Sequence, residues 1–385
     1  MQWKVSFKVV QFHYIVNMRR RLTDFYIFAW IANHLIYYPT PLILNVFWSF
    51  GFLLGICLII QIISGIFLAM HYIPHSDLAF NSVIYIMRDV NLGWFIRYLH
   101  CNCASFCFFF LYCHMFRGIY YHSYKKPLSW ISGFLLFILM IATAFFGYIL
   151  PWGQMSYWAV TVITNLLNAF PVIGQPILEL IWGGFSVSNA TLTRFYSFHF
   201  TLPFLIVGLS ALHIALVHEE DTSNQLLIAT HDYIPFYPYF FKKDLVVLWI
   251  TLFILIYIIT YYPNIFSHPD NNIPANALVT PTHIVPEWYF LPYYAILRSV
   301  SNKLGGLCLL IAFLVFLAFL PWLSSNNNYI LSNYFYKPKT FFFATTFCSF
   351  IVLGWIGYQM PITPYIECGL INFIFFCINL FFFIS

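Results

Sequence analysis

Long apolar stretches with almost no charged residue follow one another along the chain from about residue 47 to its end. A helix rises 1.5 Å per residue, so about 20 apolar residues cross the roughly 30 Å hydrocarbon core of a bilayer. The pattern predicts an all-α polytopic membrane protein with eight transmembrane helices, at residues 47–70, 98–116, 128–150, 195–217, 245–263, 304–322, 341–358 and 368–383. The third and sixth end at Leu150-Pro151 and Leu320-Pro321, since proline removes a backbone donor.

The polar segments between these stretches predict how the chain is divided. We expect a membrane-surface arm at 1–46 rather than a cleaved leader, a four-helix bundle at 47–218, a polar loop at 219–244 and the last four helices at 245–385. Two connections, 152–194 and 264–303, are long for a helix bundle. Loops of that length usually fold into short helices that carry a function.

The composition excludes several classes of protein. Apolar residues make up 62% of the chain and charged residues only 8%, which fits neither a soluble globular protein nor a disordered one. The net charge of +5 includes no basic run of the kind that binds nucleic acid. The nine cysteines form no C-x-x-C pair, which argues against a zinc ribbon and against covalently attached haem.

The basic residues gather on one side of the predicted membrane topology. Twelve of the 17 lysines and arginines fall in the N-terminal arm and in alternate connections, and five fall in the others. The basic side should therefore face the cytoplasm or its organellar equivalent. The two long connections lie on the less basic side.

Four histidines lie inside two predicted spans at a repeated spacing. His100 and His114 are fourteen residues apart, as are His199 and His213. Fourteen residues make nearly four helical turns, so each pair shares a helix face, roughly 21 Å apart along the axis. Both spans enter from the less basic side, which places His100 and His199 at one level and His114 and His213 at the other. Two facing imidazoles are the axial ligands of a low-spin haem, although any one histidine could simply make a hydrogen bond within the membrane.

Glycines and arginines near these positions fit two haem sites. Four glycines repeat the fourteen-residue spacing in two other spans: Gly51, Gly65, Gly133 and Gly147. Their missing side chains would let a porphyrin edge approach the backbone, although close packing between membrane helices also selects small residues. Arg97 and Arg117 each lie one turn nearer the water than a predicted ligand. They could pair with haem propionates or be ordinary interfacial arginines.

Five stretches of sequence carry a resemblance to a known family. They read GWFIRYLH (93–100), GYILPWGQMSYW (147–158), TLTRFYSFHF (191–200), HPDNNIPANAL (268–278) and PEWYFLPYYAILRS (286–299). These stretches resemble the cytochrome b family of respiratory quinol:cytochrome c reductases, complex III, over the chain from about Gly51 to Pro364. The plastid homologue is less similar, because it usually has one more residue between the second pair of histidines and carries the last helices on another chain.

The resemblance implies two b-type haems, non-covalently bound, and two sites for ubiquinone and ubiquinol. His100 and His199 would be the metal ligands of the low-potential haem, and His114 and His213 those of the high-potential haem. Glu287 would accept a quinol hydroxyl and its proton at an outer site. Around it the family places Tyr148, Phe145 and Tyr294. The positions that match an inner quinone-reducing site are His218, Asp244, Trp48 and Phe236.

The chemistry of these residues agrees with the implied sites. Quinol oxidation needs a proton acceptor at the membrane face, and a carboxylate in an apolar loop has a tunable proton affinity. Glu287 lies among proline and aromatic residues. The alternative is that Glu287 caps a loop helix and that Asp244 is the N-cap of the fifth predicted span.

The implied function is an energy-conserving one. Quinol would be oxidised at the outer site, with one electron passing to an iron–sulfur partner and the other crossing the membrane to reduce quinone at the inner site. The implied partners are a Rieske iron–sulfur protein, cytochrome c-one, a second copy in a homodimer, accessory subunits and membrane lipid. The implied location is the mitochondrial inner membrane, or alternatively a bacterial plasma membrane. A plastid-type quinol:plastocyanin reductase is one rival. Another is a haem-free proton-coupled transporter, although the sequence has no inverted repeat of the kind many transporters carry.

The chain departs from the family pattern at four places. Ala159 stands where glycine is usual, and its methyl group narrows the outer quinol pocket. We therefore predict weak binding of strobilurin-type inhibitors, and tight inhibition of turnover would contradict this. The usual S-N-N-P reads Ser223-Asn224-Gln225-Leu226 here. At the inner site, Phe52 replaces a small polar residue and Phe240 a common tyrosine.

Overall fold

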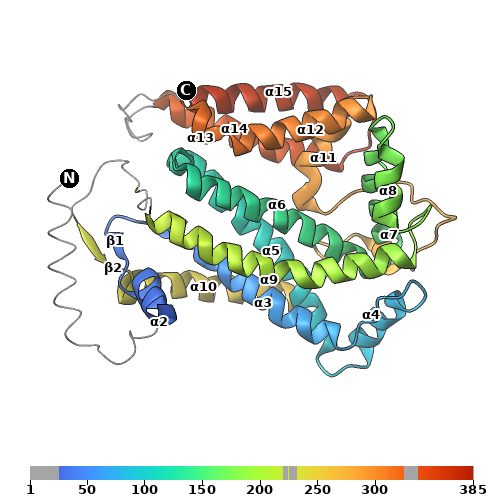
Figure 1. Cartoon of the computed structure of the whole chain (residues 1–385), viewed down its shortest axis with the longest axis horizontal. Coiled ribbons are helices and arrows are strands. Elements are labelled where there is room, and N and C mark those ends of the chain that lie inside the picture. The colour runs from blue at the N-terminus through green and yellow to red at the C-terminus, as the bar shows by residue number, and fades with distance from the viewer. Residues whose placement is uncertain (1–25, 220–223, 225–231, 325–336, 385) are drawn as a thin grey trace.

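Four long helices form the first half of the molecule. A computed structural model describes residues 26–219, 224, 232–324 and 337–384. The four helices are α3 (Phe50–Ala69), α5 (Gly93–Tyr120), α6 (Pro127–Ile149) and α9 (Asn189–Glu219). α3 packs along α5 and α6 packs along α9, and Figure 1 shows the four running side by side. The all-α membrane fold and its first four helices are thus as the sequence predicts.

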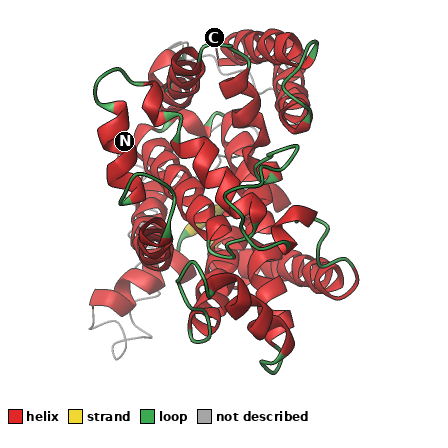
Figure 2. Ribbon diagram, turned by 90° about the vertical axis from the view of Figure 1, so that its right-hand side faces the viewer, coloured by secondary structure: helices red, strands yellow, loops and turns green. Residues whose placement is uncertain are grey.

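The remaining helices pack on two sides of these four. α10 (Phe236–Tyr261) lies against α5 and α3. The other group contains α11 (Leu291–Arg298), α12 (Lys303–Ala318), α13 (Leu320–Leu323), α14 (Lys337–Tyr358) and α15 (Tyr365–Ile384). A buried aromatic cluster joins this group to α5 and α6 through Phe108, Phe137, Tyr289, Phe313 and Phe376. Figure 2 shows that helices make up most of the molecule.

Seven of the eight predicted spans are matched by helices long and apolar enough to cross a bilayer in the part of the chain that the structure describes. The exception is 304–322, where α12 has only 16 residues and ends at Ala318. At 1.5 Å per residue it reaches about 24 Å, short of a full crossing. The chain then starts the separate helix α13, with Pro321 in its first turn. The count of eight therefore stays a prediction.

Short elements cover the less basic end of the bundle. The two long connections fold into short helices, as predicted: α7 (Gln154–Thr164), η4 (Leu167–Ala169) and α8 (Gly174–Trp182) in one, and η5 (Pro269–Asn272), η6 (Trp288–Phe290) and α11 in the other. The connection between α3 and α5 adds α4 (Ala79–Arg88). Figure 1 shows α4, α7 and α8 together at this end.

A different set of short elements lies at the basic end. They are α2 (Tyr26–Ile31), η1 (Ala32–Ile36), β1 (Pro39–Pro41), η2 (Val46–Ser49), η3 (Ser123–Lys125) and β2 (Tyr233–Pro235). β1 pairs antiparallel with β2, with Thr40 opposite Ile234. This pairing fastens the segment before α3 to the segment that leads into α10. Residues 1–25 of the predicted arm and most of the polar loop lie outside the described residues.

The start of α10 also differs from the sequence prediction, as do the starts of α5 and α9. The prediction began this span at residue 245, whereas the helix begins at Phe236 and includes Lys242, Lys243 and Asp244. A search for charge-free runs stops at these residues, although helices commonly continue past the hydrocarbon into the interface, where charges are tolerated. Asp244 therefore lies inside the helix, and the alternative that it is an N-cap is wrong.

Candidate functional site

The structure brings the four histidines together in two levels. The ring centroids of His100 and His199 are 6.1 Å apart, with planes at 81°. Those of His114 and His213 are 6.4 Å apart, with planes at 69°. α5 contributes one histidine to each level and α9 the other. The first level lies toward α4 and α7, and the second lies toward β1 and β2.

These spacings suit a metal held between two facing imidazoles. A metal–imidazole bond is about 2.0 Å long, and a bound nitrogen is about 1.1 Å from its ring centroid, so two rings that held one metal from opposite directions would have centroids roughly 6.2 Å apart. The observed 6.1 and 6.4 Å agree with this value. Each level holds only two histidine ligands, and the one cluster of three metal-binding side chains among the described residues lies elsewhere, at Cys57, Cys103 and Cys107. The donor set therefore fits a haem better than a zinc site of three or four ligands.

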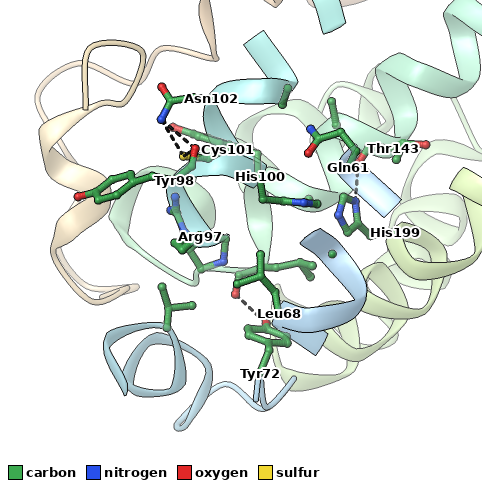
Figure 3. A pocket seen from close by; sticks show the side chains of 18 of the residues that line it. Gln61, Leu68, Tyr72, Arg97, Tyr98, His100, Cys101, Asn102, Thr143 and His199 are labelled. Carbon is green, nitrogen blue, oxygen red and sulfur yellow. Dashed lines mark hydrogen bonds between the residues drawn. The ribbon is translucent and has the colours of Figure 1, made fainter. Parts of the chain in front are cut away.

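Three of the four histidines are held through Nδ1, which leaves Nε2 to bind a metal. Nδ1 of His100 is 2.9 Å from the Ser64 hydroxyl oxygen. Nδ1 of His213 is 2.8 Å from the Ser132 hydroxyl oxygen. Nδ1 of His199 is 2.8 Å from the Thr143 carbonyl oxygen, the contact drawn in Figure 3. An Nδ1–H group that donates to the protein fixes the tautomer and the orientation of a metal-binding imidazole.

The fourth histidine has a different neighbour. Nδ1 of His114 is 3.3 Å from Nη2 of Arg117. A guanidinium only donates hydrogen bonds, so Nδ1 of His114 is the acceptor in this contact. Nε of Arg117 is buried and has no hydrogen-bond partner among the described residues. A buried cation with an unsatisfied donor beside the second level is what an acidic group such as a propionate would complement.

The four predicted glycines face the four histidines. A Cβ atom built on each would meet one imidazole ring: Gly51 meets His114, Gly65 meets His100, Gly133 meets His213 and Gly147 meets His199. The contact is 3.4 Å at Gly51 and 3.1 Å at Gly65 and Gly133, and it is closest at Gly147. The glycines thus make room for the ligand rings themselves, and the approach of a porphyrin edge to the backbone stays a prediction.

The first level opens into a cavity of about 540 Å³. His100, His199, Gly65 and Gly147 line it together with Arg97, Tyr148 and Glu287. Figure 3 shows His100 and His199 turned toward each other across this space, with Arg97 on the side of Tyr72. A cavity of this size, lined mainly by apolar side chains with polar and charged groups converging on it, is typical of a ligand site.

The carboxyl group of Glu287, which lines this cavity, has a shifted pKa. Glu287 precedes η6 in the connection between α10 and α11 and is half-buried. Burial raises the pKa of its carboxyl from 4.5 to about 7, and nearby Arg97 acts in the opposite direction. Its side chain makes no capping hydrogen bond to η6, so the capping alternative finds no support. A carboxyl that titrates near neutral pH can accept and release a proton under working conditions.

Three of the other residues implied for the outer site do not line the cavity. Phe145 packs against the buried cluster that contains Phe195 and Trp152. The guanidinium of Arg298 lies over the ring of Tyr294, 5.1 Å from its centroid. Ala159 is 3% exposed within α7. Of the outer-site set, the structure brings only Tyr148 and Glu287 together beside the first level.

The residues implied for the inner site gather at the basic end. His218 lies in the last turn of α9, and its ring stacks on Tyr38 with centroids 3.6 Å apart. Trp48 lies under the guanidinium of Arg117 at 5.3 Å. The rings of Phe236 and Phe240 stack at 6.4 Å. Asp244 is only 6% exposed and follows Lys243 in α10. No hydrogen bond joins His218 to Asp244 in the described part of the chain.

Four residues that contact the site were missed by the sequence analysis. Ser64 and Ser132 directly precede Gly65 and Gly133, and this repeated Ser-Gly pair is a signal that could have found them. Thr143 acts through its backbone carbonyl, which no side-chain pattern reveals. His34 contacts His218 from outside the predicted spans.

The comparisons with known proteins agree with this geometry. The family model described as Cytochrome b/b6/petB matches residues 35–221, and the one described as Cytochrome b(C-terminal)/b6/petD matches residues 274–377. A cytochrome b of Phytophthora megasperma is 53% identical over 353 residues, 91% of each chain. One of Solanum tuberosum is 50% identical over 373 residues, 95% of this chain and 94% of that one.

A solved structure extends the agreement to three dimensions. A chain of a hyperthermophilic respiratory Complex III aligns with a TM-score of 0.86 at 30% sequence identity, over 95% of this chain and 96% of that one. The two family models together span well over half of the sequence, and the relatives cover nearly all of it. The chain is thus an integral membrane protein of the electron-transport chain and belongs to the cytochrome b family.

Proposed function

We propose that this chain is the membrane subunit of a quinol:cytochrome c reductase that holds two b-type haems and carries two quinone sites. The observation that supports this most directly is the pair of histidine levels, with ring centroids 6.1 and 6.4 Å apart. His100 and His199 would hold the low-potential haem, and His114 and His213 the high-potential haem. When bound, the haems supply one-electron transfer between the two sides of the membrane.

The chain's own residues hold and orient the ligand rings. Ser64, Ser132 and the Thr143 carbonyl fix the imidazoles through Nδ1. Arg97 and Arg117 lie beside the two levels and would neutralise propionates. The apolar walls of the bundle exclude water, which strengthens every one of these electrostatic interactions.

The outer reaction begins with a proton transfer to Glu287. Ubiquinol entering the cavity would donate a hydroxyl proton to the Glu287 carboxylate, which lies beside the first level. Oxidation of one ubiquinol releases two electrons and two protons. One electron would go to the Rieske iron–sulfur partner and the other would cross the bundle to the inner site. Tyr148 lines the same cavity and would contact the bound ring.

At the inner site a quinone would take up electrons and protons from the opposite side of the membrane. His218 and Asp244 are the polar groups, and Trp48 and Phe236 supply aromatic contacts at the same end of the molecule. Proton release at one face and uptake at the other would make the cycle translocate protons. The working assembly would be a homodimer with cytochrome c-one and accessory subunits, in the mitochondrial inner membrane.

The test is a count of haems in the purified complex. A dithionite-reduced minus oxidised spectrum, with pyridine haemochrome quantitation, should give two protohaems per chain. The absence of haem would overturn the proposal and favour a haem-free transporter. A third haem bound covalently, with plastocyanin as electron acceptor, would favour the plastid-type reductase instead.

A further inference from the structure

A second histidine contacts His218 at the basic end. Nδ1 of His34 is 2.9 Å from Nδ1 of His218, and the two rings are nearly parallel, at 8°, with centroids 5.2 Å apart. One Nδ1 must donate and the other accept, so the two imidazoles are in opposite tautomers when both are neutral. We refer to His34 and His218 as the histidine dyad.

Backbone structure fixes the position of His34 in the dyad. It lies in η1, a five-residue π-helix that continues α2 and packs against α9 and α10. π-helical segments are rare and are often found at functional sites. Tyr38 covers one face of the His218 ring, and the strand that begins at Pro39 ties this segment to β2. Both elements hold the His34 side chain against the end of α9.

The dyad supplies polar groups to an inner site in which two positions that are often polar are phenylalanine. Phe52 and Phe240 stand at inner-site positions that are often polar in the family. Phe52 packs against a buried cluster, and Phe240 contacts the ring of Phe236 and the Lys243 ammonium. Nδ1 of His218 is occupied by His34, so a quinone oxygen can be reached only through Nε2 of His218. His34 is therefore placed to act on the quinone through His218.

We propose that His34 is a positioning and proton-sharing residue of the inner quinone site. This rests on the proposed function. Reduction of ubiquinone to ubiquinol consumes two electrons, supplied by ubiquinol oxidised at the outer site, and two protons. One proton would pass from Nε2 of His218 to a quinone oxygen as the proton on His34 Nδ1 moves to His218 Nδ1. In the same step Nε2 of His34 would take up a proton from water on the basic side, so both rings stay neutral, and the second proton would come from the same water.

The experiment uses two replacements that separate hydrogen bonding from proton transfer. In the purified complex, His34→Asn keeps an amide near the position of Nδ1 but cannot relay a proton, whereas His34→Leu removes both properties. A Glu287→Gln background slows the outer route about 100-fold, so that ubiquinol reduces the haems mainly through the inner site. The limiting rate and the apparent KM for ubiquinol are measured in water and in deuterium oxide. His75→Asn, at an exposed position on the opposite end, is the matched control.

The proposal predicts a different result for each His34 variant. His34→Asn should slow the limiting rate about tenfold, leave the apparent KM within about twofold and increase the solvent isotope effect. His34→Leu should slow the rate at least as much and also raise the apparent KM. A limiting rate and isotope effect unchanged in His34→Asn would overturn proton sharing. If His218→Leu also left the inner reaction unchanged, or if haem were absent, the proposed function itself would fail.

Discussion

At the scale of single residues, Glu287 links the cavity to a measurable pH dependence. Burial raises the pKa of its carboxyl to about 7. A proton acceptor must be ionised, and the ionised fraction of a group with this pKa rises about tenfold between pH 6 and pH 8. We expect the rate of quinol oxidation by the complex to rise by a similar factor over this range, measured as cytochrome c reduction with saturating quinol.

Replacement of the carboxyl tests the assignment of this pH dependence. Glu287→Gln removes the acceptor and should slow quinol oxidation by about 100-fold, leaving a residual rate that no longer rises through pH 7. Glu179→Gln is the matched control, because the partly exposed Glu179 side chain in α8 accepts a hydrogen bond from Gln175, away from the cavity. A Glu287→Gln complex with the original pH profile would show that another group titrates.

The Ser132 hydroxyl, which bonds to a histidine of the second level, should affect how tightly the high-potential haem binds. Ser132 holds Nδ1 of His213 at 2.8 Å. Loss of such a partner typically weakens metal binding by about 10–100-fold. We expect Ser132→Ala to lower the occupancy of the high-potential haem in reduced-minus-oxidised spectra. Thr251→Ala is the control, since the Thr251 hydroxyl donates to the Val247 carbonyl of its own helix. Equal haem loss in both would refute a specific role.

Residue spacing in the sequence predicted which histidines face each other, because a helix converts a fourteen-residue interval into a shared face. It could not predict the partners of their Nδ1 atoms. Ser64 and Ser132 come from a neighbouring helix, and which neighbour packs where depends on contacts far apart in the chain. The dyad partner His34 lies before the first span, where hydrophobic periodicity carries no information.

At the scale of whole elements, the close packing of α6 against α9 depends on a missing side chain. A Cβ at Gly147 would overlap the His199 ring, whereas a Cβ at Gly208, in α9, would meet nothing within 4 Å. Gly147→Ala should therefore displace the first-level ligand and reduce the haem content from two to about one per chain, as an interior with native packing density cannot absorb the overlap. Gly208→Ala should keep both haems. Full haem content in Gly147→Ala would mean that the ring has room to move.

Helix ends were the least predictable property of the elements. The apolar run correctly located α12. The helix nevertheless ends at Ala318, before Pro321, which the sequence pattern indicated as its end. α10 continues through two lysines and an aspartate that interrupt the apolar run. In both places the boundary follows local backbone geometry and the depth of the interface, which hydropathy alone does not encode.

At the scale of the whole molecule, the C-terminal helices position the loop that carries Glu287. This loop continues into η6 and α11, and α11 packs against α14 and α15. The Tyr112 hydroxyl, from α5, donates a hydrogen bond to the Tyr289 carbonyl, and the Trp288 indole donates to Ser105, also in α5. The outer site is therefore assembled from both halves of the chain, and its geometry depends on how the halves dock.

Arg298 is the side chain that most directly fixes this docking. Its guanidinium donates hydrogen bonds to the carbonyl oxygens of Ile356 and Gln359 at the end of α14, where helix carbonyls lack partners. Arg298→Met keeps the length of the side chain but loses these bonds, at a cost of about 1–3 kcal/mol.

We expect Arg298→Met to lower the melting temperature of the complex and to slow quinol oxidation several-fold. Both haem bands should be unchanged because the histidine levels lie in the other half of the chain. Lys303→Met, at an exposed position at the start of α12, should change neither measurement. Loss of haem in Arg298→Met would show that the docked C-terminal helices also hold the histidine levels in place, beyond the packing of α3 on α5 and of α6 on α9.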